Sequence, residues 1–237
     1  MPANRELVTV ITPTLDSRRE FMAGAIKCFL SQDYPRLEMV IVRESGADMT
    51  VSRCDHGNLC TKCAQPQRRQ IRYISCGGGI GAARNAACKA ARGSIIVQFD
   101  DDDWQSPDRV SHQVGLLQSS GKALVAYHTV LCEEKRKVII WDEAGKHPAS
   151  QFWRWKLANP NDAWGLSYCY RRDWWERHPF PEVREREDGP FLSAAVGANA
   201  ALFVDSENHM CAVNHTGNGS GRLVGGNEYQ ELPGDPR

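Results

Sequence analysis

Four consecutive carboxylates, Asp100 to Asp103, directly follow a short apolar run from Ile95 to Phe99. Like charges on neighbouring residues raise one another's pKa values, and a divalent cation removes that cost. Carboxylate oxygens are the ligands that Mg²⁺ and Mn²⁺ prefer. The apolar run indicates a buried strand, and ligands of open α/β sheets gather beyond the carboxyl ends of strands. We therefore predict a metal site at a strand end; the alternative is a solvated acidic turn that caps the following helix.

A second group of metal-binding side chains lies in a long segment without hydrophobic periodicity, from about residue 49 to 69. It contains Cys54, His56, Cys60 and Cys63. Three thiols and an imidazole can complete a tetrahedral Zn²⁺ site, and structural zinc would keep an aperiodic loop ordered. The spacing is not that of a standard zinc finger, so a loop with free thiols is the alternative.

A glycine-rich turn, Gly77 to Gly81, precedes an alanine-rich helix expected from Ala82 to Arg92. Backbone N–H groups at a helix N-terminus favour anions, which makes the turn a candidate phosphate cradle, although glycines also mark ordinary loops. Arg84 carries a planar guanidinium that suits a phosphate or a base edge. We therefore expect Arg84 to contact a phosphorylated ligand.

Hydrophobic patterns place these groups on an α/β fold. Apolar and β-branched runs predict strands at 7–12, 37–42, 71–75, 95–99, 123–127, 137–141, 201–204 and 210–213. Apolar spacing predicts a helix at 22–30, and Ser106-Pro107 predicts another helix start. A last helix is expected near Asp188-Gly-Pro190. The strand–helix–strand order implies parallel strands with a right-handed crossover.

The bulk composition is that of an ordinary globular protein. The 237 residues include 29 Lys+Arg and 29 Asp+Glu, which argues against a nucleic-acid binder relying on bulk charge. No stretch approaches the roughly 18 apolar residues of a membrane span, and the N-terminus lacks a secretory pattern. The nine cysteines are an odd number and mostly single, which suits a reducing compartment. These features predict a cytoplasmic protein.

Four segments occur in an order that is characteristic of one family. They are Thr9–Thr14 with Ser31–Pro35, Val42–Asp48, Gly79–Asn85, and Phe99–Trp104 with Pro107–Arg109. Together they resemble the family 2 glycosyltransferases, over roughly residues 5–120. The resemblance implies a single α/β domain of the Rossmann-like GT-A type with a mostly parallel central sheet. It also implies metal-dependent transfer of a sugar from a nucleotide-sugar, a UDP-sugar most often, to an acceptor hydroxyl with inversion.

The resemblance assigns donor-binding roles to individual residues. Thr14 and Arg84 would line the nucleotide pocket. Glu44 would contact the uracil, where the family has Asp, and this longer side chain leaves the identity of the base open. Trp164 is the candidate for contact with the donor sugar because an aromatic face suits a sugar ring, although most tryptophans belong to a core or an interface.

The resemblance also divides the acidic run. Asp100 and Asp101 would lie near the ribose, and Asp102, in the family's Asp-x-Asp segment, would bind Mn²⁺ or Mg²⁺. Related enzymes often return a late histidine to the metal or the diphosphate, and His215 is so placed. A lone histidine is equally well a surface or core residue.

A carboxylate must take the proton from the acceptor hydroxyl in an inverting transfer. Family members carry a Glu-Asp pair at about the distance of Glu187-Asp188 from the metal segment. Asp188 is therefore the candidate base, with Glu187 as the second choice and Glu185 as a poorer one. The alternative is that Asp188 only caps the helix that Pro190 begins.

We expect one domain over residues 1–224. Its nucleotide-sugar half would span about 5–120, with the zinc loop at 50–69, and its acceptor half about 121–224, followed by a mobile tail at 225–237. The acceptor is open: a saccharide, a small molecule, a peptide or a nucleic acid. Two alternatives remain, a nucleotidyltransferase that releases pyrophosphate and a non-catalytic module that binds nucleotide-sugars and zinc.

Overall fold

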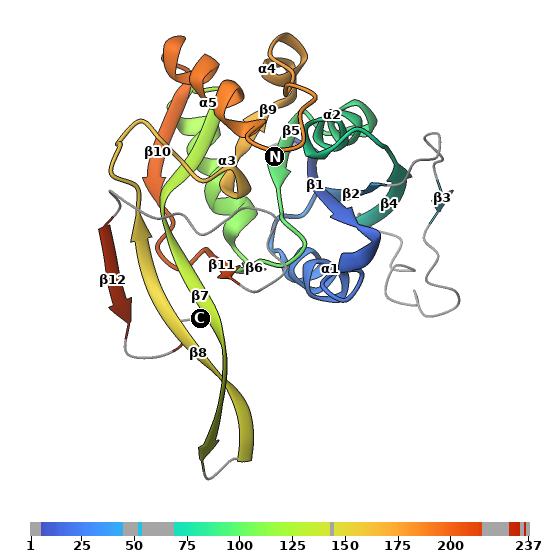
Figure 1. Cartoon of the computed structure of the whole chain (residues 1–237). Helices are drawn as coiled ribbons and strands as arrows, with labels where there is room; N and C mark the ends of the chain where they lie inside the picture. Colours follow the sequence, from blue (N-terminus) through green and yellow to red (C-terminus); the bar gives the residue numbers. More distant parts are fainter. Residues whose placement is uncertain are drawn as a thin grey trace.

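The computed structural model describes residues 6–44, 52–53, 69–142, 145–214, 228–232 and 235. Within these ranges the chain forms one 12-stranded sheet with helices on both faces (Figure 1). The sheet order is β12-β8-β7-β9-β5-β1-β2-β4-β3, with β10, β11 and β6 attached to one side of this path.

The first half of the sheet is parallel, as the strand–helix–strand order predicts. It consists of β1 (Val8–Leu15), β2 (Leu37–Glu44), β4 (Arg69–Ser75) and β5 (Ile95–Gln98), with the two-residue β3 (Ser52–Arg53) antiparallel to β4. Because all four parallel strands point the same way, their carboxyl ends share one edge of the sheet.

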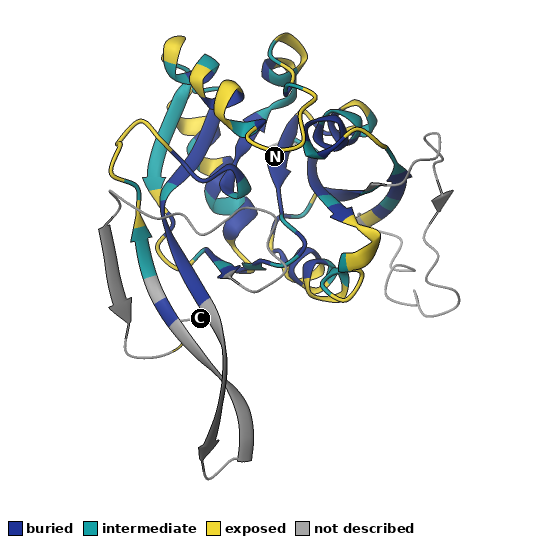
Figure 2. Ribbon diagram, viewed as in Figure 1, coloured by how far each residue is buried: buried dark blue, intermediate teal, exposed yellow. Residues whose placement is uncertain are grey.

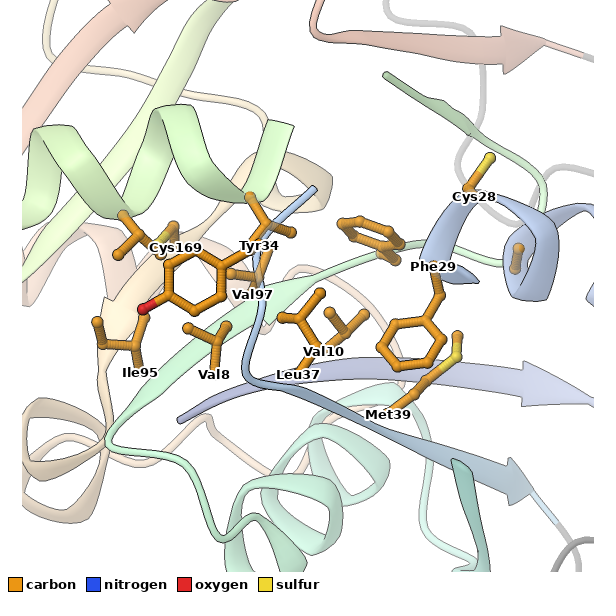
Figure 3. Close-up of a cluster of buried hydrophobic side chains, with 14 of the residues drawn as sticks. Val8, Val10, Cys28, Phe29, Tyr34, Leu37, Met39, Ile95, Val97 and Cys169 are labelled. Carbon is orange, nitrogen blue, oxygen red and sulfur yellow. The ribbon is translucent and has the colours of Figure 1, made fainter. Parts of the chain in front are cut away.

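Helices α1 (Met22–Ser31) and α3 (Arg109–Ser120) cover one face of this parallel half. Val10 and Val97 of the sheet pack there against Phe29 of α1 and Leu117 of α3, and all four side chains are buried. Figure 3 shows part of this cluster, with Phe29 lying over Val10 and Met39. Every second residue of the strands faces this side, as the alternation of side chains in a strand requires.

The opposite face is covered by α2 (Ile80–Ala90), α4 (Arg172–Arg177) and α5 (Asp188–Gly197). Ile11 and Ile96 pack there with Ala87 of α2 and Phe191 of α5. The central strands are therefore buried on both faces, as Figure 2 shows in dark blue. This double burial explains why β1, β2 and β5 are continuous apolar runs.

The second half of the sheet is largely antiparallel. It contains β6 (Trp104–Gln105), β7 (Leu124–Asp142), β8 (Gly145–Lys156), β9 (Cys169–Arg171), β10 (Ala201–Asp205), β11 (Met210–Asn214) and β12 (Glu228–Leu232). Strand β9 lies antiparallel between β5 and β7 and joins the two halves. The α/β class is confirmed, and the sheet as a whole is mixed.

Several elements differ from the sequence prediction, which gave none of β3, β6, β8 and α4. The predicted strands at 123–127 and 137–141 are parts of the single strand β7, which β8 pairs along most of its length. Helix α3 begins at Arg109 rather than beside Ser106, whose hydroxyl donates to the Asp108 carboxylate over 2.5 Å. Residues 228–232, within the predicted tail, form β12. The edge of β8 supplies backbone partners that composition cannot indicate.

Gly93 illustrates how tightly the loop before β5 packs on β1. A Cβ at this position would lie 2.6 Å from the carbonyl oxygen of Leu7 and 2.8 Å from the backbone nitrogen of Thr9. Gly93→Ala should therefore lower the free energy of unfolding by about 1–3 kcal/mol, measured by urea denaturation. Gly24→Ala in α1 meets nothing within 4 Å and should raise it by about 0.5–1 kcal/mol. Equal stabilities of the two variants would contradict this packing.

Candidate active site

The acidic run lies at the carboxyl end of β5, as predicted. The backbone N–H of Phe99 still donates to the carbonyl of Ile11 in β1 over 3.0 Å, and the chain leaves the sheet at Asp100. Asp101 and Asp103 are only 4% and 7% exposed. This burial excludes a solvated acidic turn and places four carboxylates beside the end of β1.

Asp101 is held by two groups from the end of β1. The hydroxyl of Thr14 donates to its Oδ2 over 2.5 Å, and Nε of Arg18 lies 3.1 Å from both carboxylate oxygens. Arg18 ends the short 3₁₀ helix η1 (Asp16–Arg18) that follows β1. The contact from Thr14 shows that the predicted nucleotide-side threonine lies at the acidic run.

Arg18 also contacts Asp102. Its Nη2 lies 2.6 Å from Oδ1 of Asp101 and 2.6 Å from Oδ2 of Asp102, so one guanidinium bridges two carboxylates. Hydrogen bonds and charges from these two aspartates raise the pKa of Arg18 although burial opposes the rise. The sequence analysis missed Arg18. One signal was available: Arg18 is a basic residue just beyond the end of β1, and β1 pairs with β5, the strand that ends in the acidic run.

Asp103 is turned toward the second half of the fold. Its Oδ1 accepts a hydrogen bond from the backbone N–H of Val213 in β11 over 3.0 Å. Burial raises its pKa well above the ordinary value, and the charges of Asp102 and Asp100 add to the rise. Asp103 therefore fastens β11 to the acidic run, with β6 pairing antiparallel to β11 beside it.

Asp100 is the most exposed of these side chains, at 29%. Burial is the largest influence on its pKa, which rises to about 6; the Arg84 charge opposes the rise, and Asp102 and Asp101 add to it. Nη2 of Arg84 lies 3.7 Å from Oδ1 of Asp100. Holding these negative charges close together costs free energy of folding, and a bound cation would lower that cost.

Arg84 is buried and forms an ion pair with Glu187. Its Nη1 donates to Oε1 of Glu187, and both side chains are at most 5% exposed. The guanidinium also lies 5.8 Å from the centre of the Phe180 ring. Arg84 therefore connects Asp100 with the residue next to Asp188. Glu187, paired with a buried arginine, is poorly suited to the role of a free base.

The glycine-rich turn is not an open phosphate cradle in this structure. The N–H of Gly81, which an anion would use, donates to the carbonyl of Val183 over 3.3 Å. Gly79 has φ 91°, and a Cβ there would lie 3.0 Å from Cα of Arg184. The expectation of a cradle is corrected: the start of α2 packs against the segment that leads to Glu187.

Asn85 completes this contact between α2 and the segment before α5. Its amide donates to the carbonyl of Phe180 over 2.8 Å, and its Oδ1 accepts from the N–H of Phe180 over 3.0 Å and from Nε1 of Trp175 over 2.9 Å. Residues of the Gly79–Asn85 segment therefore position residues 180–188. Sequence reasoning missed this role because the two segments are about a hundred residues apart.

Asp188 is the first residue of α5 and is half-buried. The N-cap of the helix is Glu187, which makes no side-chain capping hydrogen bond, so Asp188 does not serve as the N-cap. Gly165 of the 3₁₀ helix η3 (Gly165–Ser167) lies against it: a Cβ at Gly165 would fall 2.9 Å from Cγ of Asp188. The negative charge of Asp188 also adds to the effect of burial in raising the pKa of Tyr168.

Trp164 belongs to a buried cluster. It is 9% exposed, its ring centre lies 4.6 Å from that of Trp155, and its backbone N–H donates to the carbonyl of Tyr127 over 3.1 Å. The structure therefore gives Trp164 a packing role, immediately before Gly165. The donor-sugar contact stays a prediction.

Several predicted site residues lie outside the described residues. They are the side chain of Glu44, at the end of β2, and Cys54, His56, Cys60, Cys63 and His215. Within the described part of the chain, no group of three or more His, Cys, Asp or Glu side chains is arranged to hold a metal ion. Across the same residues, every helix is too short or too polar to cross a bilayer.

Comparison with known sequences identifies the family. The sequence profile of glycosyl transferase family 2 matches residues 9–207, which include the acidic run and Asp188. The chain belongs to this family. Its family is one of glycosyltransferases, and the resemblance noted in the sequence is confirmed.

Two curated relatives illustrate the range of the family. The chain is 27% identical over 129 residues to the UDP-Glc:alpha-D-GlcNAc-diphosphoundecaprenol beta-1,3-glucosyltransferase WfaP of Escherichia coli, covering 54% of this chain and 48% of WfaP. It is 33% identical over 138 residues to the succinoglycan biosynthesis protein ExoO of Rhizobium meliloti, covering 58% and 37%. The chain therefore matches about half the length of these relatives or less.

Solved structures confirm the GT-A fold of this glycosyltransferase. S. aureus TarS, residues 1–349 in complex with UDP-GlcNAc, superposes with a TM-score of 0.62 at 17% identity, covering 90% of this chain and 60% of TarS. The mannosyltransferase PcManGT of Pyrobaculum calidifontis, in complex with GDP-Man and Mn²⁺, gives 0.58 at 19% identity, covering 90% and 58%.

The residues of this glycosyltransferase fit a divalent cation at the acidic edge. A guanidinium already bridges Asp101 and Asp102, which shows that these oxygens face a position where positive charge is stabilised. Mg²⁺ in such enzymes is bound through one or two carboxylates together with substrate phosphates and water. A small set of protein ligands is therefore sufficient, and Asp102 is the carboxylate that would hold the ion.

The raised pKa of Asp100 makes a prediction for the metal-free protein. Because the folded pKa of about 6 exceeds the ordinary 3.8, folding favours the protonated carboxyl, and this contribution to stability is lost as the pH rises from about 4 to about 6. Asp100→Asn should therefore unfold at higher urea concentration than the native chain at pH 7, with little difference at pH 4.

Urea titrations in the presence of a chelator test this expectation. Asp173→Asn is the matched control, since the Asp173 side chain is 70% exposed, and it should change stability by less than about 0.5 kcal/mol at either pH. An Asp100→Asn variant that is less stable than the native chain at pH 7 would contradict the raised pKa of Asp100.

Proposed function

We propose that this glycosyltransferase moves a sugar from a nucleotide-sugar, with UDP as the nucleotide, to an acceptor hydroxyl with inversion. The observation that carries the proposal is the buried carboxylate pair Asp101-Asp102, held at the carboxyl end of β5 around a single positive charge. A site of this kind suits a divalent cation and the diphosphate that it binds. The names of relatives add support: WfaP carries UDP-Glc in its name, and TarS has been solved with UDP-GlcNAc.

The donor would lie across the carboxyl ends of β1, β2 and β5. Asp100 is the acidic side chain open enough to meet the ribose, and Glu44, at the end of β2, remains the proposed contact for the base. Mn²⁺ or Mg²⁺ at Asp102 would hold the two phosphates and neutralise the charge on the leaving diphosphate. His215 is a proposed further ligand. Support comes from Val213, two residues earlier, whose N–H binds Asp103.

Asp188 is the proposed base. It would accept the proton of the acceptor hydroxyl while that oxygen attacks the anomeric carbon. Arg84 neutralises Glu187, the residue before Asp188. Of these two carboxylates, Asp188 is therefore available for proton transfer, and Glu187 has a positioning role. Gly165 of η3 packs closely against the Asp188 carboxylate, and any side chain at this position would collide with it. These residues do not identify the acceptor.

The remaining sequence predictions are kept as proposals. They are a structural Zn²⁺ held by Cys54, His56, Cys60 and Cys63, a cytoplasmic location, and a boundary near residue 120 between a donor half and an acceptor half.

Incubation of the purified chain with UDP-sugars and GDP-sugars, with and without Mn²⁺, tests the proposal. We expect metal-dependent release of the nucleoside diphosphate, from UDP-sugars in preference to GDP-sugars. Asp188→Asn should lower the rate by about 10²–10⁴-fold while donor binding persists, and Asp102→Ala should remove metal-dependent donor binding. Release of pyrophosphate would instead indicate a nucleotidyltransferase, and binding without turnover a non-catalytic module.

A substitution at Gly165 tests the placement of Asp188 without changing any charge. Gly165→Ala should displace the Asp188 carboxylate and lower kcat by about 10²-fold, because small misplacements of a catalytic group are costly. Gly115→Ala in α3 is the control, since a Cβ there meets nothing within 4 Å. If steady-state measurements gave Gly165→Ala the same kcat as the native chain, the role of Asp188 as the base would be contradicted.

A further inference from the structure

Arg18 makes contacts of two different kinds with the acidic run. Its Nε is held by both oxygens of Asp101, each 3.1 Å away, while Nη2 reaches across to Oδ2 of Asp102 at 2.6 Å. The hydroxyl of Thr14 fixes Asp101 from the other side over 2.5 Å. Nη2 also lies 2.6 Å from Oδ1 of Asp101, so Asp101 is held by both Nε and Nη2, and Nη2 is shared between the two aspartates.

The guanidinium and a divalent cation compete for Asp102 in this arrangement. A metal ion on this carboxylate would place two positive centres within a few ångströms of each other, and their repulsion is strong in a buried site. The side chains of Asp102 and Arg18 are 6% and 16% exposed, so water screens them little. Metal binding through Oδ2 of Asp102 therefore requires Nη2 to leave that oxygen.

A nucleoside diphosphate would give the departing nitrogen a new partner. Arginine binds phosphate with its planar fork, and the diphosphate must lie next to the metal that it chelates. Arg18 could keep its two Nε contacts with Asp101 while Nη2 turns from the aspartates to a phosphate oxygen. The ring of Phe21, 5.3 Å from Cζ of Arg18, supports the guanidinium on its face.

We infer that Arg18 is a donor-binding residue that occupies Asp102 in the free protein and transfers to the diphosphate when metal and nucleotide bind together. The inference rests on the proposed function and adds a regulatory property to the same site. Because Arg18 opposes the metal alone and attracts the metal–nucleotide pair, it couples the two binding events. Such coupling is reciprocal, so the metal must strengthen nucleotide binding by the factor with which the nucleotide strengthens metal binding.

Two titrations of the full chain test this role without measuring turnover. Mn²⁺ binding is followed by electron paramagnetic resonance in the absence of nucleotide, and UDP binding is followed by calorimetry in the presence of Mn²⁺. Arg18→Gln should bind Mn²⁺ alone about tenfold more tightly than the native chain and bind UDP with Mn²⁺ about tenfold more weakly. The factor by which Mn²⁺ strengthens UDP binding should therefore be smaller in Arg18→Gln than in the native chain.

Arg177→Gln in α4 is the matched control because it removes the same charge from a side chain that is 62% exposed. This variant should show native affinities in both titrations. Thermal unfolding of the variants without ligands shows whether each is folded, and Arg18→Lys provides a second variant that keeps the charge but not the fork.

The outcomes separate this inference from the proposed function. If native and Arg18→Gln chains bind Mn²⁺ and UDP equally well, the role of Arg18 is overturned while the proposed donor site stands. Weaker binding of Mn²⁺ alone by Arg18→Gln would also overturn it. If neither chain binds UDP with Mn²⁺ and Asp102→Ala changes nothing, the proposed function fails, and the inference fails with it.

Discussion

The buried ion pair between Arg84 and Glu187 is the interaction on which the rest of the site depends. It joins a helix of the parallel half to the residue before Asp188, and the same guanidinium faces Asp100. Loss of either partner would leave an uncompensated charge in the core, which is strongly destabilising. The acidic run and Asp188 are therefore fixed relative to each other by Arg84, together with the hydrogen bonds of Asn85 to Phe180 and Trp175.

The Gly79–Asn85 segment shows how a motif can be correctly recognised and wrongly interpreted. Its glycines suggest a phosphate cradle, yet they allow the backbone of Val183 and Arg184 to approach α2 closely. Asn85 continues the contact with three hydrogen bonds to Phe180 and Trp175. In this chain the residue types of the segment serve a close contact between two distant parts of the chain.

The sequence was sufficient for features that depend on local pattern. Continuous apolar runs predicted the buried strands, and four aspartates after one run predicted the acidic strand end. It was insufficient where side chains from distant positions meet, since nothing near Arg18 indicates Asp101 and nothing near Arg84 indicates Glu187. The single strand β7 and the strand β12 were missed for the same reason, because the pairing with β8 decides them.

The acidic edge also has a consequence for the lifetime of the protein. Carboxylates with raised pKa values, such as Asp100 and Asp103, make the free chain less stable than a chain whose charges are neutralised by bound ligands. Because proteases act mainly on transiently unfolded chains, a bound cation would also make the chain more resistant to proteolysis.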